Sequence, residues 1–190
     1  TVVFKPASIT PATAVRITEL FEAAGIPPGV LNLVIGSGSE AGDEIINHPA
    51  VKAISFTGSN GVGIRLYEQA SRRGAKVQCE MGGKNPVVVL EDADMDLAVE
   101  STAQGAFGSS GQRCTATSRA VVVDQVADEF VERVAQRAKS MRIGPGSDPA
   151  TEMGPTVDEN QFNTVLSYIN IGREDGATLV CGGSRATGDG

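Results

Sequence analysis

The alternation of strand-like and helix-like segments constrains the fold of this chain more than any other feature of its sequence. Short apolar runs predict strands at residues 2–4, 31–35, 53–56, 75–79, 86–90, 119–123 and 177–180. Between them, apolar residues recur at helical spacing, as at Ile17, Leu20, Phe21 and Ala24. This alternation is typical of α/β domains with largely parallel sheets.

The predicted helices each carry one apolar face. They lie at residues 11–24, 61–71 and 94–107, and around 130–138 and 162–169, with a further short helix through Ile45 and Ile46. Pro11 occupies the first helical position that proline favours, and Gly25 ends that helix. The helix at 61–71 is expected to bury Val62, Leu66 and Ala70.

Two successive glycines, Gly82 and Gly83, predict a domain crossing, because paired glycines after a strand allow backbone conformations that other residues avoid. We therefore expect an α/β fold with a Rossmann-like parallel sheet in residues 1–82. Residues 83–190 are expected to form part of a second α/β domain.

Composition argues against several partners. The formal net charge of -7 does not fit nucleic acid or an anionic membrane surface, which would favour clustered Lys and Arg. No apolar run approaches the roughly 20 residues of a membrane span. Three cysteines at no metal-like spacing, with a single histidine, predict a reduced, cytoplasmic compartment and no metal site. The first residues resemble neither a signal peptide nor an initiator sequence, so we expect a piece of a longer protein.

Cys114 is the candidate nucleophile. It lies in residues 111–116, a run of small and polar residues. A free thiol has a pKa of about 8.5, so it needs help to ionise at neutral pH. Arg113 is adjacent, and the run is expected to be a turn entering a helix, where free N–H groups and the dipole favour an anion. These residues alone leave open that Cys114 is a small packing residue.

Glu80 is the candidate base. It directly follows residues 75–79, at the end of the strand predicted there, and burial at this place is expected to raise its pKa toward that of a usable base. A carboxylate at this place could instead cap a turn or pair with Lys84. Its neighbour Cys79 is expected to face the opposite side of the strand.

Residues 58–63 run from a strand through glycines into a helix, so N–H groups and the helix dipole converge where a dinucleotide phosphate could sit. An ordinary strand-to-helix turn has the same pattern. The familiar G-x-G-x-x-G is missing, because Gly42 follows Gly36 and Gly38 one place late. Lys5 follows a strand, which places it at the sheet edge where ligands of α/β proteins bind, or else as a solvated surface lysine.

Other conspicuous residues are interpreted as structural. Asp92, Asp94 and Asp96 could suggest a metal site, but acidic residues that open an apolar-periodic helix favour capping. His48, before a proline in a connection, is expected to be a loop residue. Cys181 is expected to be buried packing.

Four motifs occur in order: Phe4-Lys5-Pro6-Ala7, Phe56-Thr57-Gly58-Ser59, Glu80-Met81-Gly82-Gly83-Lys84 and Gly111-Gln112-Arg113-Cys114. Their order and separations resemble the aldehyde dehydrogenase superfamily over the whole chain, and several motifs in register make the match specific. The resemblance implies an enzyme with NADP or NAD as cofactor and a small-molecule aldehyde as substrate. Residues 1–82 would belong to its NAD(P)-binding domain and 83–190 to its catalytic domain, within a homo-oligomeric full-length protein.

The same resemblance implies roles for individual residues. Cys114 would attack the aldehyde, the thiohemiacetal would give hydride to the nicotinamide, and Glu80 would guide water onto the thioester. The implied cofactor contacts are Lys5, Ser8, Gly38, Gly58, Ser59, Val62, Gly63 and Met81. Many NAD-preferring relatives carry Glu at the position of Ser8, so we expect NADP to be accepted at least comparably to NAD.

The resemblance also implies that parts of the site lie outside this sequence. The N–H of Cys114 can supply one oxyanion donor, but the family's second donor, an Asn, is expected upstream of Thr1. A Glu that holds the nicotinamide ribose is expected beyond Gly190. The isolated chain is therefore expected to be inactive.

Three alternatives stay open at this point. An acylating relative would pass the acyl group to coenzyme A, but such enzymes generally lack the base that Glu80 matches. A cysteine hydrolase would need a histidine partner, and His48 is the sole candidate. A binding protein could reuse the fold without turnover. For the substrate, residues 55–63 and 111–116 resemble semialdehyde dehydrogenases, particularly the α-ketoglutaric semialdehyde type.

Overall fold

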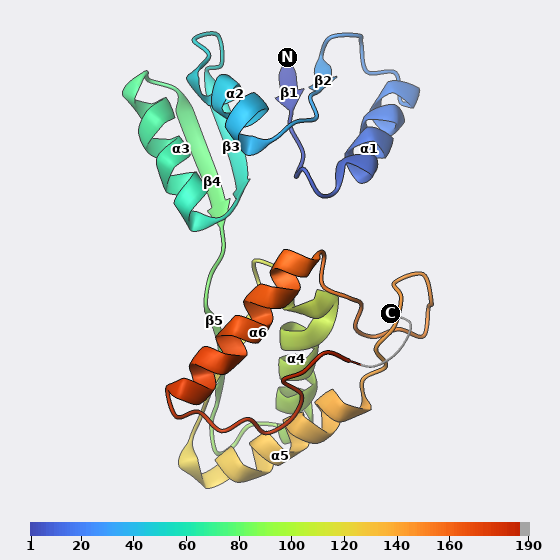
Figure 1. The fold of residues 1–190 in the computed structure, drawn as a ribbon, viewed down its shortest axis with the longest axis vertical. Coiled ribbons are helices and arrows are strands. Elements are labelled where there is room, and N and C mark those ends of the chain that lie inside the picture. Colours follow the sequence, from blue (N-terminus) through green and yellow to red (C-terminus); the bar gives the residue numbers. More distant parts are fainter. Residues whose placement is uncertain (187–190) are drawn as a thin grey trace. The chain divides into compact units, whose positions relative to one another are not determined.

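The computed structural model describes residues 1–186, and its alternating strands and helices confirm the predicted α/β class (Figure 1). The chain divides into two compact units, one from Thr1 to Met81 and one from Gly82 onward. The division falls beside the glycine pair that the sequence singled out. Every strand pair in the described chain is parallel.

The first unit begins with two short strands joined by a helix. Strand β1 (Val2–Phe4) pairs with β2 (Leu31–Leu33), and α1 (Pro11–Ala23) connects them. A single π-helical turn, η1 (Gly38–Gly42), then leads into the short helix α2 (Asp43–Asn47).

A second strand pair carries most of the core of this unit. Strands β3 (Ala53–Gly58) and β4 (Lys76–Met81) are joined by α3 (Asn60–Arg72), a right-handed crossover being the usual form of such a connection. One face packs on the helices through an apolar cluster that comprises Ile46, Leu66, Ala70, Ala75, Ile54, Phe56, Val77 and Cys79. The opposite face is polar and exposed, with Ser55, Thr57, Gln78 and Glu80.

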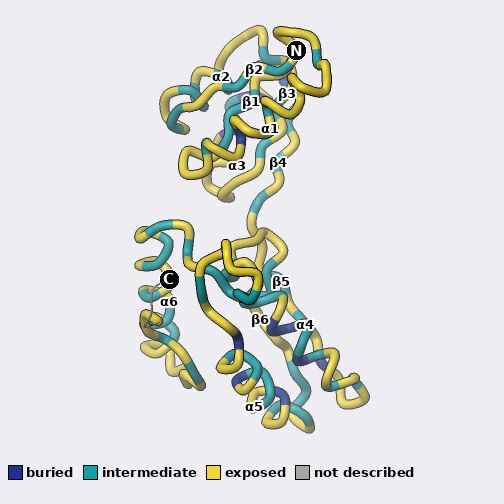
Figure 2. The backbone as a smooth tube through the Cα atoms, turned by 90° about the vertical axis from the view of Figure 1, so that its right-hand side faces the viewer, coloured by how far each residue is buried: buried dark blue, intermediate teal, exposed yellow. Residues whose placement is uncertain are grey.

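The second unit is built on β5 (Asn85–Val89) and β6 (Thr117–Val122), joined by α4 (Met95–Phe107) and the 3₁₀ turn η2 (Gly108–Gly111). Helices α5 (Asp124–Ser140) and α6 (Glu159–Glu174) follow. Val89, Val99 and Phe130 form its core, and buried positions gather on β5, α4 and α5 (Figure 2). The other sheet face is apolar but exposed, as Val88 and Val121 show at 63% and 56%.

The capping interpretation of the aspartate cluster is confirmed for Asp94. Its carboxylate accepts a hydrogen bond from the Leu97 N–H at 3.1 Å, at the start of α4. This satisfies one of the amide donors that a helix leaves unpaired in its first turn.

Two predictions about the strands and helices are wrong. Residues 177–180 are not a strand, because a strand needs a neighbour to complete its ladder and no described strand lies beside this segment. Val62 is 41% exposed, because the face of α3 that meets the sheet is set by Gly63, Leu66 and Ala70. No helix within residues 1–186 is long and apolar enough to span a membrane.

Candidate active site

Cys114 lies on a tight turn that leads into a strand. The Ala116 N–H donates to the Arg113 carbonyl at 3.0 Å, so Cys114 is the second residue of a β-turn between η2 and β6. The thiol is free and exposed. The expectation of a turn entering a helix is wrong, since β6 follows. Helix-dipole assistance from a helix beginning at Cys114 is therefore excluded.

The approach to this turn is left-handed. Ser109, Ser110 and Gly111 have φ of 53°, 56° and 67°, a region that costs a residue with a side chain on the order of 1 kcal/mol or more. Hydrogen bonds hold the conformation: Ser110 Oγ donates to the Gly154 carbonyl at 2.6 Å, and Gln112 Oε1 accepts from the Val157 N–H at 3.0 Å. The segment before α6 thus fixes the path of the chain into Cys114.

A second support comes from Asn85, the first residue of β5. Its amide Nδ2 donates to the Cys114 carbonyl at 2.8 Å and to the Ala116 carbonyl at 3.1 Å. The Cys114 N–H donates to no atom of the described residues, so it is available to an incoming oxygen. Sequence reasoning missed Asn85, although its place directly after Gly82-Gly83-Lys84 was a usable signal.

Arg113 does not contact the thiol in the described chain. Its guanidinium reaches the C-terminal end of α4 and donates to the Gln104 carbonyl at 3.4 Å. It lines a cavity of about 260 Å³ that also contains Arg137 and Glu152. Arg113 therefore supports the backbone around Cys114 through α4, and the structure shows no ion pair with the sulfur.

The same cavity holds a small ion-pair network. Arg137 donates to Glu100 at 2.8 Å and to Glu152 at 2.6 Å, which joins α4, α5 and the following loop. Hydrogen bonds from Arg137 and Gln104 lower the pKa of Glu100. A hydrogen bond from the Arg142 N–H and a smaller contribution from Arg137 lower the pKa of Glu152. The network links α4 and α5 to the loop at Glu152, which continues to Gly154, the partner of Ser110.

Glu80 lies near the end of β4, paired in register with Thr57. Its side chain is exposed, so the burial expected for it is not found: strand alternation places it on the polar face that no described element covers. Cys79 faces the opposite side of the strand, as expected, and packs against the core with Sγ 3.6 Å from the Gly63 carbonyl. Glu80 belongs to the first unit and Cys114 to the second.

Two segments that carry candidate cofactor residues, residues 5–8 and 36–38, meet at the ends of β1 and β2. Lys5 Nζ donates to the Pro6 carbonyl at 2.8 Å and to the Gly36 carbonyl at 3.1 Å, and Ser8 Oγ donates to Gly36 at 3.2 Å. An ammonium group has three donors, so one remains for a ligand hydroxyl or phosphate. At Gly38, the start of η1, an added Cβ would meet open space. This cluster fits the adenosine end of a dinucleotide.

A second cluster lies where β3 passes into α3. Gly58 ends β3 and Ser59 is the N-cap of α3. The Ser59 side chain makes no capping bond, so its hydroxyl and the first-turn N–H groups are free to donate to an anion. Gly63 packs against β4, and an added Cβ would lie 2.5 Å from Met81 Sδ. Val62 is exposed beside them. The residues present fit a pyrophosphate, and these contacts remain predictions.

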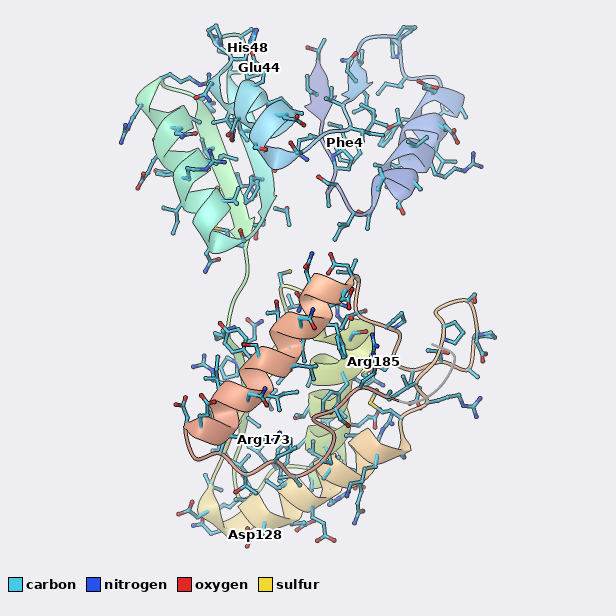
Figure 3. The ribbon with its side chains drawn as sticks, in the orientation of Figure 1. Phe4, Glu44, His48, Asp128, Arg173 and Arg185 are labelled. Atoms are coloured by element: carbon cyan, nitrogen blue, oxygen red, sulfur yellow. The ribbon has the colours of Figure 1, made fainter. Side chains whose placement is uncertain are left out.

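His48 is a turn residue, as expected. Figure 3 shows it beside Glu44 at the end of α2. Its Nδ1 accepts the Ala50 N–H at 3.2 Å, and its own N–H donates to the Glu44 carbonyl at 2.9 Å. A ring nitrogen engaged in this way is not placed to act as the base of a cysteine hydrolase.

Comparison with known sequences gives a consistent result. The aldehyde dehydrogenase family profile matches residues 1–190. The chain is 47% identical to an alpha-ketoglutarate semialdehyde dehydrogenase of Haloferax volcanii, over 100% of this chain and 39% of that protein. It is 45% identical to a 1-pyrroline-5-carboxylate dehydrogenase of Geobacillus kaustophilus, over 96% of this chain and 36% of that protein. The chain thus spans less than two fifths of the length of these relatives.

Solved structures agree with the sequence match. The chain is similar to betaine aldehyde dehydrogenase of Staphylococcus aureus in complex with NAD+, with a TM-score of 0.94 and 38% identity. That alignment covers 98% of this chain and 37% of the other.

Proposed function

Because the chain belongs to the aldehyde dehydrogenase family, we propose that its full-length protein oxidises an aldehyde to a carboxylate with NAD(P) through a covalent intermediate on Cys114. The observation that carries the proposal is the exposed thiol on a hydrogen-bonded turn whose own N–H is available. A nucleophile needs access to the carbonyl carbon and a donor for the oxygen that becomes negative. Cys114 has both.

The first step is attack of the Cys114 thiolate on the aldehyde carbon. A C–S bond forms, the carbonyl π electrons move to oxygen, and the Cys114 N–H donates to that oxygen. The chemistry supplied by bound NAD(P) is acceptance of a hydride, which leaves a thioester on Cys114.

The second step is hydrolysis with Glu80 as base. Its carboxylate takes a proton from water as the water oxygen attacks the thioester carbon, and the C–S bond then breaks to regenerate the Cys114 thiolate. An exposed carboxylate at a strand end is accessible to water and held by the β4 ladder. The presence of Glu80 favours hydrolysis over acyl transfer to coenzyme A.

The cofactor would be held by the two clusters of the first unit. Lys5 and Ser8 would contact the adenosine ribose, with Gly38 beside them, while Ser59 and the start of α3 would receive the pyrophosphate. Since Ser8 is neutral, we include NADP as well as NAD in the proposal.

For the substrate we propose an aldehyde that carries a carboxylate. The names of the relatives, an alpha-ketoglutarate semialdehyde and a 1-pyrroline-5-carboxylate dehydrogenase, both describe a carboxylate-bearing compound. The odd number of cysteines, Cys79, Cys114 and Cys181, favours a reducing compartment. A homo-oligomer of the full-length protein is part of the same proposal.

The test is turnover by the full-length protein across matched aldehydes with and without a carboxylate, each with NAD and with NADP. We expect reduced cofactor to form with the carboxylate-bearing aldehydes, and no turnover above background in Cys114→Ala, which should still bind cofactor. Turnover in Cys114→Ala would disprove the nucleophile. A preference for uncharged aldehydes would disprove the substrate class alone.

A further inference from the structure

The turn that carries Cys114 is fixed by a side chain to which neither the motifs nor the mechanism gives a part. Asn85 donates both of its described hydrogen bonds from one nitrogen, Nδ2, to the carbonyls of Cys114 and Ala116. These two carbonyls flank Thr115 and lie within the turn closed by the Ala116 N–H and the Arg113 carbonyl. Asn85 therefore holds the turn at the nucleophile and at its closing residue.

The geometry specifies what these bonds control. The Cys114 carbonyl belongs to the peptide group that follows the nucleophile, so a bond to it restrains rotation about ψ of Cys114 and limits the directions that the side chain can take relative to β5. The Cys114 N–H lies on the preceding peptide, whose path is set by Ser110 and Gln112. Asn85 thus acts directly on the peptide that follows Cys114, while the peptide that carries the oxyanion donor is also held through the bond from the Ala116 N–H to the Arg113 carbonyl.

The backbone of Asn85 is itself held in place by neighbouring residues. It begins β5, in register with Thr117 at the start of β6, at a bulge between Asn85 and Pro86. The Ser118 hydroxyl donates to the Asn85 carbonyl at 3.5 Å, and Arg119 donates to the Lys84 carbonyl. The backbone around Asn85 is therefore held from β6, and the amide extends from it to the turn.

We propose that Asn85 is a positioning residue for Cys114, which aims the thiol by holding the Cys114 and Ala116 carbonyls. The proposal rests on the proposed function. Asn85 touches neither substrate nor cofactor in it, and acts through the backbone of the nucleophile. Because a displacement of about 1 Å can cost on the order of 100-fold in rate, loss of this contact should reduce the chemical step far more than binding.

The test compares Asn85→Ala with a matched control, Asn32→Ala, in the full-length protein. Asn32 in β2 likewise donates from Nδ2 to two backbone carbonyls, those of Val2 at 3.2 Å and Gly29 at 3.0 Å. Each variant removes two amide-to-carbonyl hydrogen bonds and creates no charge. For Asn85→Ala we expect kcat to fall on the order of tenfold or more, with the aldehyde KM and cofactor Kd within about twofold of wild type. Asn32→Ala should leave all three unchanged.

The rate of alkylation of Cys114 by iodoacetamide, measured against pH, distinguishes a change in the orientation of the thiol from a change in its chemical reactivity. A small reagent approaches an exposed thiol from many directions, so the pH midpoint and plateau rate should be the same in Asn85→Ala and wild type. If kcat stays within about twofold of wild type, or falls together with cofactor affinity, the positioning role is wrong. An inactive wild-type protein with normal alkylation would instead refute the proposed function.

Hydrogen exchange provides a readout that does not depend on turnover. Asn85→Ala should increase exchange in the peptide that contains residues 113–117, while peptides from the first unit stay as in wild type. If Asn85→Ala does not fold, Asn85→Ser carries the same measurements, with a kcat loss of a few-fold expected. Unchanged kcat and unchanged exchange in a folded variant would overturn the proposal.

Discussion

Glu80 and Cys114 are held in place in different ways by the two units. Glu80 is fixed by backbone alone: β4 pairs with β3 over its whole length, and the Glu80 side chain leaves a polar face toward solvent. Cys114 sits on a turn outside any strand, held by the side chains of Asn85, Ser110 and Gln112.

This difference indicates which substitutions should displace each of the two residues. A ladder of backbone bonds survives most single side-chain changes, because no one side chain carries the alignment. A turn held by three side chains loses a defined part of its support with each one removed. We therefore expect the placement of the carboxylate to be lost only when Glu80 itself is replaced. The orientation of the Cys114 thiol should instead become less well defined with each supporting side chain that is removed.

The largest expected effect tests the first unit. Glu80→Gln should leave acylation nearly intact and slow thioester hydrolysis on the order of 100-fold, since an amide cannot take the proton from water. Rapid mixing of the full-length protein should show a burst of reduced cofactor and then a slow steady state. Glu68→Gln, which removes an exposed carboxylate on α3, should change neither phase. A missing burst would mean that Glu80 acts before hydrolysis.

A smaller effect is expected for the second unit from Ser110→Ala. The variant loses the bonds to the carbonyls of Gly154 and Pro155 that hold a left-handed residue, which should lower stability by about 1 kcal/mol and kcat by a few-fold. Ser140→Ala, which removes a similar hydroxyl-to-carbonyl bond at the end of α5, is the control and should leave kcat unchanged. Equal kcat in both variants would show that the aim of Cys114 does not depend on this support.

The smallest effect concerns the cofactor. Ser8→Glu should lower kcat/KM for NADP by several-fold while leaving the NAD value nearly unchanged, because a carboxylate repels a 2′-phosphate. The Ser8 hydroxyl donates to Gly36 at 3.2 Å on an exposed surface, so it must rotate to donate to a phosphate, and its own contribution is expected to be modest. Ser71→Glu, at the far end of α3, controls for net charge. An equal loss with both cofactors would refute the role of Ser8.

The sequence predicted the elements better than their exposure. Short apolar runs identified β1 to β6, since buried parallel strands in α/β domains are recorded in local composition. The burial of Glu80 was wrong because alternation decides which face a side chain takes, and what covers that face is a tertiary fact. The predicted burial of Val62 was wrong for a related reason. The buried face of α3 consists of Gly63, Leu66 and Ala70, and helical spacing alone does not exclude Val62 from it.

The supports of Cys114 could not be found locally. Serine is uncommon at positive φ, and Ser110 holds it through a bond to Gly154, 44 residues away. Asn85 reaches the Cys114 carbonyl across 29 residues. No period or propensity encodes such contacts. The helix entry expected at Cys114 was equally a matter of context, since a polar run with glycine also fits a turn into a strand.

The close approach of α3 to β4 has a consequence for chemical ageing. Met81 follows Glu80 directly, and its sulfur occupies the space beside Gly63, a residue in the first turn of α3 that has no side chain. Oxidation of Met81 would convert this thioether into a polar sulfoxide and add an oxygen atom where a single carbon already has no room. Oxidation at this one sulfur would thus disturb the packing of both β4 and α3, and methionine sulfoxide reductases reverse the modification.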